Sequence, residues 1–556
     1  MKKLLLSVAI LFFIEFQAIA QKYPQGYFRH PLNIPMELVA NFGEIRTNHW
    51  HMGLDIRTQQ RENLPVYAAA EGYVARVVVE PGGFGQAIYI AHPNGFTTLY
   101  AHLKAFYPEL EQYVTSQQYI LESWRVDLKL KPGQFPVVKG QYIARSGNTG
   151  GSQGPHVHFE IRDTQTDKVL NPLLFRFPIP DAVPPTLVRL AMYDRNKSTY
   201  TQAPQLLNIQ ATRNRTVKVG SDKISFAIGA VDRFSGSANP NGIYSARISM
   251  DGKPISEFVL DNIDYIETRL MNAQIDYPFS ARGGSFVQHI TPLPGARGIP
   301  YKTYNEDGII YLKDLEPHDI VIDVKDANFN SSKIAFRVQY DPALKLSPLY
   351  EARERLIPNQ VNVFERDFFE IYTSEATVYD TVNVSYSNAI AGATNAVSHL
   401  HSFLDHTIPS HDYITVRIKP TVDLSASERN RVVIKNTFGS RTYVQKAQWQ
   451  NGWLAAKFRQ FGKFQAFIDE QPPTINNISP DLSRASRIVF TPRDNFNTIK
   501  NFRVELNGKW LRFTNDKGKT WIYTFDERFP RGEHQLRVIV EDEAGNVTDK
   551  VWTVRK

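Results

Sequence analysis

The sequence predicts a mostly β protein that is built from several domains. Its 556 residues exceed what one hydrophobic core organises, because domains usually contain about 100–200 residues. Short runs of β-type composition recur, for example at 74–79, 87–90 and 157–161, and turn signals such as the Pro-Gly-Gly segment at 81–83 separate them. Long helical periodicity is nearly absent. We therefore expect an N-terminal antiparallel sheet domain followed by β-sandwich domains.

The composition excludes several classes of protein. A hydrophobic fraction of 42% is too high for a disordered chain. The counts of 32 glycines and 33 prolines are ordinary, so collagen-like and low-complexity chains are excluded. The absence of cysteine excludes a disulfide scaffold, an iron–sulfur cluster, a cysteine-ligated zinc and a cysteine nucleophile. Any bound metal must therefore use His, Asp or Glu.

Residues 1–20 have the features of a cleaved secretory signal. Lys2 and Lys3 precede an apolar run from Leu4 to Phe16, and a small-x-small site ends at Ala20. The run is shorter than the roughly 20 residues that span a bilayer, and no later stretch is long enough. We expect an exported protein, periplasmic or extracellular, with no membrane span.

The net charge of +8 suits an anionic polymer such as a cell wall. Nucleic acid would fit the charge equally well, but export argues against that partner. A simple contribution to solubility is the competing explanation of the charge.

The chain divides at a cluster of prolines between 172 and 185. Two later segments share three sequence matches in the same order, which predicts a repeated sandwich domain. The matches pair 181–186 with 469–474, 231–234 with 493–496, and 324–330 with 540–546. The repeats resemble the immunoglobulin-like modules of exported bacterial proteins, and the first copy has an insertion near 266–310. The expected domains are 21–178, a sandwich at 181–340, a sandwich of unknown type at 341–468, and a sandwich at 469–556.

Two groups of residues in the first domain carry the chemistry. His51 and Asp55 are separated by three residues, and a second group contains His156, His158 and Glu160. On a strand, these last three side chains share one face, and Val157, Phe159 and Ile161 share the other. A lone His-x-His pair is usually two surface histidines. Together, however, two imidazoles and one carboxylate match a catalytic zinc site with its fourth position open to water.

These residues also carry a family resemblance. The segments 42–55, 100–103 and 147–160 resemble the lysostaphin-type zinc endopeptidases, also called the LytM or β-lytic family, which cut peptide cross-links of bacterial peptidoglycan. The resemblance covers roughly 40–175 and implies an antiparallel peptidase fold of the duplicated hybrid motif type. It implies that His51, Asp55 and His158 bind Zn²⁺ and that His102 and His156 assist catalysis. All five positions are filled, which favours an active enzyme.

The roles of the two catalytic histidines stay open at this point. One of His102 and His156 would accept a proton from water, and the other would stabilise the oxyanion or protonate the leaving amine. Glu160 and Asn148 are candidates for orienting ligands or substrate. Two alternatives belong to other classes: a non-cleaving wall-binding or regulatory module, and a structural adhesin. We expect peptidoglycan peptide stems as the substrate and, through the C-terminal sandwiches, a protein partner.

The segment 104–135 departs from the family, which has only a short connection there. It contains a helix that begins at Pro108, with Leu110 and Val114 on one face, and an alternating run at 126–130. Such an insertion either forms a wall or a lid of the substrate groove, or it is a peripheral hairpin without a role in binding. We expect it to lie beside the groove.

Two further sets of histidines are not expected to bind the metal. His49 would share a strand face with His51, close to the site but outside the ligand set. A second group lacks a glycine-rich frame and is predicted to be a polar surface loop; it comprises His399, His401, Asp405, His406 and His411.

Overall fold

The computed structural model describes residues 23–296, 298, 300–345, 352–390, 392 and 394–556. The segment predicted to be a signal, 1–20, lies outside these residues. The chain is 44% strand and 9% helix, which confirms the mostly β prediction. Within the described residues, the structure contains no helix whose length and apolarity would let it cross a membrane.

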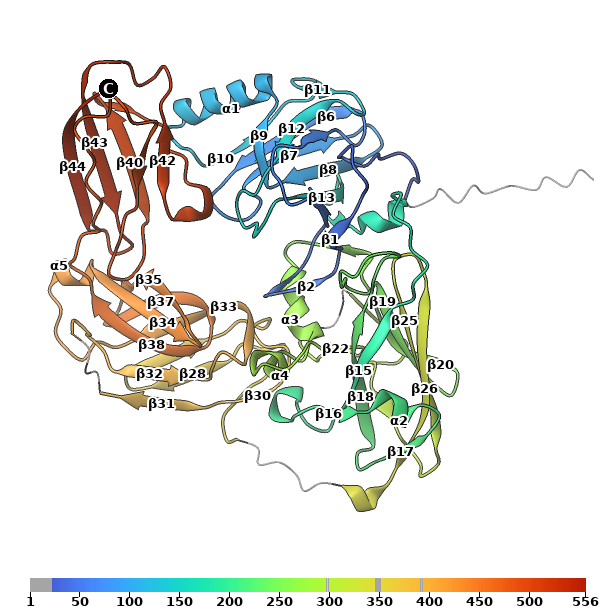
Figure 1. Cartoon of the computed structure of the whole chain (residues 1–556). Coiled ribbons are helices and arrows are strands. Elements are labelled where there is room, and N and C mark those ends of the chain that lie inside the picture. The colour runs from blue at the N-terminus through green and yellow to red at the C-terminus, as the bar shows by residue number, and fades with distance from the viewer. Residues whose placement is uncertain (1–22, 297, 299, 346–351, 391, 393) are drawn as a thin grey trace, which may run out of the picture.

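The first domain is built around one long antiparallel sheet (Figure 1). In spatial order its main strands are β1 (Leu38–Ala40), β4 (Leu54–Arg57), β13 (His156–Asp163), β8 (Phe96–Ala101), β7 (Gln86–Ala91), β6 (Gly72–Val79) and β10 (Val126–Lys129). Strand β13 lies between β4 and β8, and its register sets His158 opposite both Asp55 and Ala101. Residues far apart in the sequence therefore meet at one end of three neighbouring strands.

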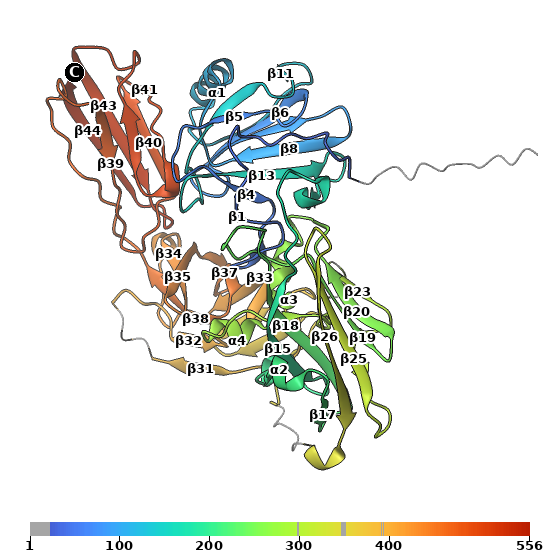
Figure 2. The same ribbon diagram turned by 45° about the vertical axis from the view of Figure 1, so that its right-hand side comes forward.

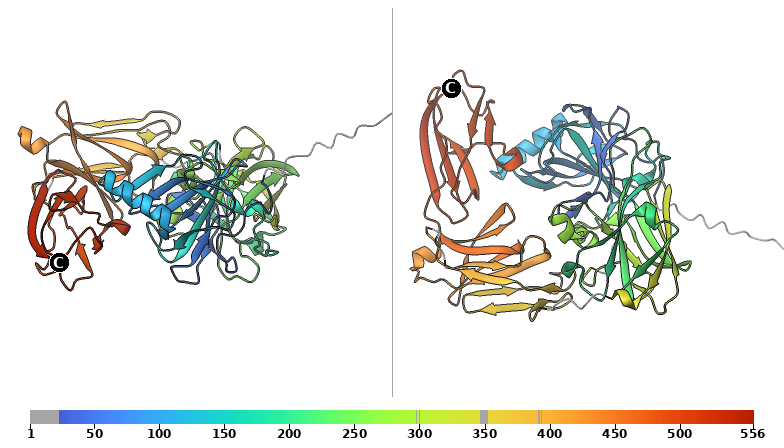
Figure 3. Two further views of the ribbon diagram at one scale, coloured as in Figure 1. Left: turned by 90° about the horizontal axis from the view of Figure 1, so that it is seen from above. Right: turned by 60° about the horizontal axis from the view of Figure 1, so that its bottom comes forward.

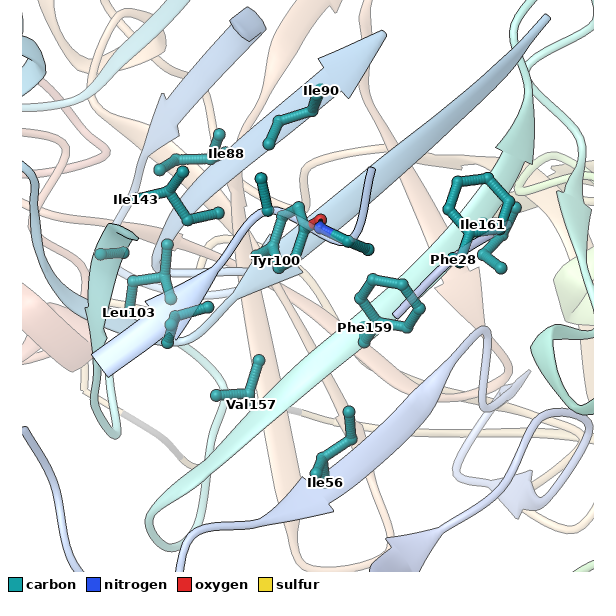
Figure 4. Packing of buried hydrophobic residues seen from close by; sticks show 14 of the residues in the cluster. Phe28, Ile56, Ile88, Ile90, Tyr100, Leu103, Ile143, Val157, Phe159 and Ile161 are labelled. Carbon is teal, nitrogen blue, oxygen red and sulfur yellow. Dashed lines mark hydrogen bonds between the residues drawn. The ribbon is translucent and has the colours of Figure 1, made fainter. Parts of the chain in front are cut away.

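The core of this domain lies under one face of the long sheet. A smaller sheet covers it, made of β5 (Pro65–Tyr67), β12 (Tyr142–Ser146) and β9 (Leu103–Phe106). Val157, Phe159 and Ile161 of β13 are fully buried in this core, together with Tyr100 (Figure 4). Because side chains alternate along a strand, the same packing directs His158 and its polar neighbours to the opposite face.

The insertion forms a helix and an edge strand. Helix α1 (Pro108–Ile120) begins at the predicted proline and buries Leu110 and Val114. Strand β10 pairs with β6 and extends the long sheet by one strand. The short strand β11 (Pro136–Val137) follows and also pairs with β6.

The second unit has two facing sheets. One contains β16 (Gln205–Leu207), β15 (Thr186–Asp194), β18 (Lys223–Val231), β22 (Gln288–His289) and β24 (Ile310–Tyr311). The other contains β17 (Thr216–Val219), β26 (Ser331–Tyr340), β25 (His318–Lys325), β19 (Ser245–Met250), β20 (Lys253–Val259) and β23 (Tyr301–Thr303). Three short helices complete it: α2 (Ile209–Thr212), α3 (Met271–Gln274) and α4 (Tyr277–Ala281).

This second unit shares a core with the first domain. Phe42, Trp50 and Met52 of the first domain belong to the hydrophobic cluster of the second unit. Strand β14 (Val169–Leu170) pairs with β21 (Asn262–Ile263) across the two. The proline cluster therefore marks a change of fold along the chain, while packing and sheet pairing run across it.

The third and fourth units are also two-sheet structures. In the third unit, one sheet contains β28 (Val363–Arg366), β29 (Phe369–Tyr372), β33 (Pro409–Ile418), β37 (Trp453–Gln460) and β36 (Gln448–Gln450). Its other sheet contains β31 (Tyr386–Ala389), β32 (Leu400–Phe403), β38 (Gly462–Ile468), β34 (Val432–Phe438) and β35 (Arg441–Lys446). In the fourth unit, one sheet contains β41 (Lys509–Trp510), β40 (Asn501–Leu506), β43 (Glu533–Glu541) and β44 (Val547–Arg555). Its other sheet pairs β39 (Arg487–Phe490) with β42 (Trp521–Thr524).

The second and fourth units repeat one strand arrangement. The order β20-β19-β25-β26 in the second corresponds to β41-β40-β43-β44 in the fourth. Both hairpins turn on two residues with positive φ, Asp251-Gly252 and Asn507-Gly508, as two-residue hairpin loops require. The third sequence match spans the ends of β25 and β43 in these sheets, and the first two matches are bridged to each other in both copies, through Thr186 and Val231 and through Thr474 and Arg493.

The four units form a closed ring (Figures 1 and 2; Figure 3, right). The fourth unit returns to the first domain and lies against α1. There Arg512 donates to the side-chain oxygen of Gln118 at 2.8 Å, Arg503 pairs with Glu122 at 2.7 Å, and Tyr119 packs edge-on against Trp510. One side of the insertion thus serves as a docking surface for the C-terminal unit.

Candidate metal centre

Three side chains of the first domain converge at the end of β4 and β13. The Nε2 atom of His51 lies 2.9 Å from Oδ1 of Asp55 and 3.1 Å from Nδ1 of His158, and the last two atoms are 2.9 Å apart. In a tetrahedral zinc site with bonds of about 2.0–2.1 Å, ligand atoms are about 3.3 Å apart. The triangle is therefore close to the size that such a metal requires, and all three residues are buried.

The hydrogen bonds around this triangle leave the correct ring nitrogens free. Nδ1 of His51 donates to the carbonyl oxygen of Asn41 at 2.8 Å, so Nε2 carries the lone pair. Nε2 of His158 donates to Oε1 of Glu160 at 2.9 Å, so Nδ1 carries it. Each histidine thus directs its metal-binding nitrogen toward Asp55, and the donor set fits a zinc ion.

A buried carboxylate supports His158 from behind. Glu160 is fully buried and also accepts hydrogen bonds from Arg162 and from the hydroxyl of Tyr265. Tyr265 belongs to the second unit and lies more than 100 positions further along the chain. Nothing in its local sequence distinguishes it, so sequence reasoning missed it; only the docking of the second unit places it here.

The electrostatics favour a positive charge at the centre. Burial opposes ionisation of Asp55, but His51 and hydrogen bonds from His156 and His158 hold its pKa well below the usual range. Burial likewise opposes ionisation of Glu160, but Arg162 and His158 lower its pKa to about 2. Burial disfavours the charged form of His158, yet its hydrogen bonds to Asp55 and Glu160 raise its pKa to about 9. Two anionic carboxylates therefore flank a position that attracts a proton or a metal cation.

His102 and His156 lie beside the ligand triangle. Their rings are 4.7 Å apart, and Nε2 of His156 is 3.3 Å from Oδ1 of Asp55. Nδ1 of His102 donates to the carbonyl of Thr149 at 2.9 Å, and Nδ1 of His156 donates to that of Gly154 at 2.8 Å. Burial, together with His156 and His158, lowers the pKa of His102 to about 3, so this imidazole is neutral at neutral pH. The structure thus brings all five predicted residues together.

The glycine-rich loop holds His102 in an unusual backbone conformation. His102 has a φ of 58°, in the left-handed region that non-glycine residues seldom occupy. Gly150 has a φ of 65°, and a Cβ there would lie 2.3 Å from the backbone nitrogen of Gly85. Only glycine lets the two loops approach so closely. This contact positions the carbonyl of Thr149, which accepts the hydrogen bond from Nδ1 of His102.

A groove on the polar face of the sheet extends from Phe84 to the insertion, and none of the five predicted residues lines it. It has a volume of about 340 Å³ and is lined by Phe84, Tyr265 and Arg162 near the centre and by Arg125 and Asp127 of the insertion. The ring of Phe84 is 5.7 Å from that of His158, so Phe84 lies between the groove and the ligand set. The insertion thus lies on the same face as the predicted ligands and forms one wall of the groove.

The other histidines have different surroundings. His49 is exposed and contacts the carbonyl of Thr47, outside the triangle. The prediction of a surface loop for the second histidine group is wrong for His401, which is fully buried, stacks on Phe369 at 4.7 Å and hydrogen-bonds to Tyr386. Alternation on β32 directs this ring into an aromatic core.

Asn148, the other candidate for orienting ligands or substrate, is next to the glycine-rich loop. Its Oδ1 atom is buried without a hydrogen-bond partner in the described chain.

Comparison with known proteins gives three matching domains. Residues 49–125 and 125–172 match the model of Peptidase family M23, residues 353–469 match a Zu5-like domain, and residues 482–555 match a Bacterial Ig-like domain. The first match covers the metal centre. The second match lies within 341–468 and its adjoining residue, where a sandwich of unknown type is predicted.

Curated relatives match about a quarter of the chain. An "Uncharacterized metalloprotease" of Haemophilus influenzae is 31% identical over 163 residues, 28% of this chain and 28% of the relative. A DD-carboxypeptidase/endopeptidase Mpg of Neisseria meningitidis is 31% identical over 158 residues, 28% of this chain and 27% of the relative. The chain thus spans just over a quarter of these relatives. The solved catalytic domain of lysostaphin from Staphylococcus simulans has 24% identity, covers 24% of this chain and 87% of that chain, and gives a TM-score of 0.17.

Proposed function

Because its N-terminal region is a peptidase family M23 domain, we propose that this protein is an exported zinc endopeptidase that hydrolyses peptide cross-links of bacterial peptidoglycan. One observation carries the proposal: one possible ligand atom from each of His51, Asp55 and His158 belongs to a buried triangle with edges of 2.9–3.1 Å. In this proposal an extended peptide would lie along the groove of about 340 Å³ next to Phe84. A relative from Vibrio cholerae named Peptidoglycan DD-endopeptidase ShyA, 26% identical over 166 residues, supports the substrate class, and a cell-wall substrate requires export.

In this proposal the side chains divide the work. His51, Asp55 and His158 hold the zinc ion, and Glu160 fixes the ring of His158. Zinc, when bound, supplies Lewis acidity and lowers the pKa of a coordinated water. His102 and His156 each keep Nδ1 protonated against a backbone carbonyl, so each offers Nε2 to accept or return a proton. The low pKa of His102 keeps this imidazole neutral at neutral pH.

The groove would orient the peptide. Its walls combine the aromatic rings of Phe84 and Tyr265 with charged groups of the insertion, Arg125 and Asp127. Phe84 and Tyr265 pack edge-on at 6.1 Å, so the second unit completes the wall nearest the ligands. We therefore expect activity to require the first two units together.

The test measures zinc and cleavage on the same preparation. We expect about one zinc per chain by elemental analysis, and new free amines when the protein is incubated with purified sacculi. Mass spectrometry of the soluble products identifies which bond is cut. Chelator treatment should abolish amine release, and added Zn²⁺ should restore it. Zinc-loaded protein that binds sacculi yet releases no amine would instead support a non-cleaving wall-binding module.

A further inference from the structure

Three aspartates meet where the chain enters the first sandwich. Oxygen atoms of Asp181, Asp232 and Asp326 lie within 4.8 Å of one another. Asp181 is in the segment before β15, Asp232 follows β18 of one sheet, and Asp326 follows β25 of the other sheet. The cluster therefore joins the incoming chain to both layers of the sandwich.

Two of these carboxylates are buried, and the neighbouring Arg233 offsets only part of the burial that raises the pKa of Asp232. Asp232 is 2% exposed and Asp326 is 1% exposed. Across the residues that the structure describes, no Lys, Arg or His forms an ion pair with any of the three. Buried carboxylates are normally paired or bound to a metal, because removing an isolated charge from water is strongly unfavourable.

Two buried oxygens of this place also lack hydrogen-bond partners in the described chain. One is Oδ1 of Asp232, and the other is Oδ1 of Asn241, whose side chain is 5% exposed. Asp232 and Asn241 exchange both backbone hydrogen bonds in an antiparallel bridge, at 3.0 and 2.9 Å. Directly opposed residues of such a bridge place their side chains on the same side. An amide oxygen is thus available beside the three carboxylates.

The C-terminal sandwich contains the same cluster at corresponding positions. Oxygens of Asp469, Asp494 and Asp542 also lie within 4.8 Å of one another, and Oδ1 of Asp494 has no partner among the described residues. In the first copy, Oδ1 of Asp326 accepts the backbone N–H of Asn330, and Oδ2 accepts its side-chain amide. Asp542 does the same with Asn546, again four positions on.

We propose that each cluster binds one Ca²⁺ ion. All the ligand atoms are oxygens, three carboxylates gather at each place, and Ca²⁺ takes six to eight oxygen ligands in flexible geometry. Zn²⁺ favours the nitrogen-rich set around His51. Mg²⁺ demands a near-ideal octahedron and keeps its waters, which a buried cluster formed by turns and a linker does not favour.

Such ions would fix how the units follow one another. Asp181 and Asp469 lie in the segments that lead into the two sandwiches, so a bound ion would hold each segment against its domain. At the second cluster, Asn546 also contacts Arg431 of the third unit, and Lys446 donates to the carbonyl of Ala544 at 2.9 Å. The fourth unit in turn places Asp516 against the backbone N–H of Gly150, at 2.8 Å, in the loop beside His102.

The test counts Ca²⁺ on the zinc-loaded full chain. Equilibrium dialysis in calcium-depleted buffer with added CaCl₂ should give about two Ca²⁺ per chain at millimolar concentration, and the melting temperature should rise. Asp232→Asn and Asp494→Asn should each remove one ion, and the double variant both. Asp319→Asn, at an exposed position on β25, is the matched control and should keep two.

The sign of one further effect separates ion binding from misfolding. Without Ca²⁺, Asp232→Asn removes one of three neighbouring like charges, so its melting temperature should equal or exceed that of the natural protein. With Ca²⁺ the order should reverse. Fewer than one Ca²⁺ per chain, a count unchanged by both asparagine variants, or Mg²⁺ binding as tightly as Ca²⁺ would each overturn the proposal.

Discussion

The metal centre of the first domain and the aspartate cluster of the first sandwich both bury carboxylates, but they balance charge in opposite ways. Asp55 lies between histidines that hold its pKa well below the usual range, against the effect of burial. Burial, with Asp326 and Asp181 as neighbours, raises the pKa of Asp232 to about 7. The protein itself supplies cationic or donating partners that outweigh the burial of Asp55, whereas at Asp232 the neighbouring Arg233 offsets only part of the effect of burial.

This difference indicates that a metal would have a different role at each of the two sites. At the histidine centre, the surrounding hydrogen bonds hold the ligands whether or not a metal is bound, as catalysis requires. At the aspartate cluster, the parts come from a linker and two sheets, so an ion would add cohesion between them. Substitutions should therefore affect chemistry at the first place and domain arrangement at the second.

The largest effect should come from removing a ligand of the histidine centre. In His51→Ala only two of the three ligands remain, so zinc should fall far below one per chain and sacculus hydrolysis should disappear. Elemental analysis and amine release measure both. His49→Ala is the control, because His49 is exposed and contacts only a nearby carbonyl. Zinc retained in His51→Ala would contradict the ligand assignment.

The next effect separates ligands from proton carriers. His102→Ala and His156→Ala leave the ligand triangle complete, so zinc should stay near one per chain. Hydrolysis should fall roughly 10²–10⁴-fold in each, the usual contribution of a general acid or base. The double variant should lose less than the sum of the two, because both residues serve the same proton transfer. Full activity in His156→Ala would refute its catalytic role.

The sequence predicted most of this centre because its signal is local. The spacing of His51 and Asp55, the alternation of His156, Val157 and His158, and the family resemblance gave all five residues, which the structure brings together. The strand composition and Pro108 likewise predicted the β architecture and helix α1, since both depend on short-range periodicity and backbone geometry.

What the sequence did not predict depends on contacts between distant segments. Tyr265 reaches Glu160 only because the second unit shares a core with the first. The burial of His401 follows from the aromatic rings of β29 and β31, which its own neighbours in sequence do not reveal. The aspartates were visible as markers of a repeat, but their convergence arises only when two sheets and a linker pack together.

A smaller effect should follow from weakening the support of His158. Glu160→Gln removes the charge that pairs with Arg162 and holds the His158 ring. We expect zinc affinity to fall about 10–100-fold, the usual effect of losing such an outer partner. Competition with a chromophoric chelator measures it, and activity at saturating zinc should change far less. Asp167→Asn is the control, because Asp167 is the exposed partner of the same arginine. Equal losses in both variants would contradict this role.

The smallest effect should come from the ion pair that docks the fourth unit on the first domain. Arg503 and Glu122 lie 2.7 Å apart, with side chains 31% and 50% exposed. Water and salt can replace either partner at such a surface, unlike at Asp55 or Asp232. A double-mutant cycle with Arg503→Ala and Glu122→Ala should give a coupling of about 0.2–1 kcal/mol. It should shrink further in high salt.

Amide hydrogen exchange within helix α1 is the appropriate measurement, because a chain of several units does not unfold in one step. Lys500→Ala removes a 3.0 Å pair with Glu541 inside the fourth unit, so it should leave exchange in α1 unchanged. A coupling above about 2 kcal/mol, or one insensitive to salt, would mean that this contact is desolvated as the buried carboxylates are. The docking surface would then resemble the metal centre, because its stability would depend on a charge pair that is shielded from water.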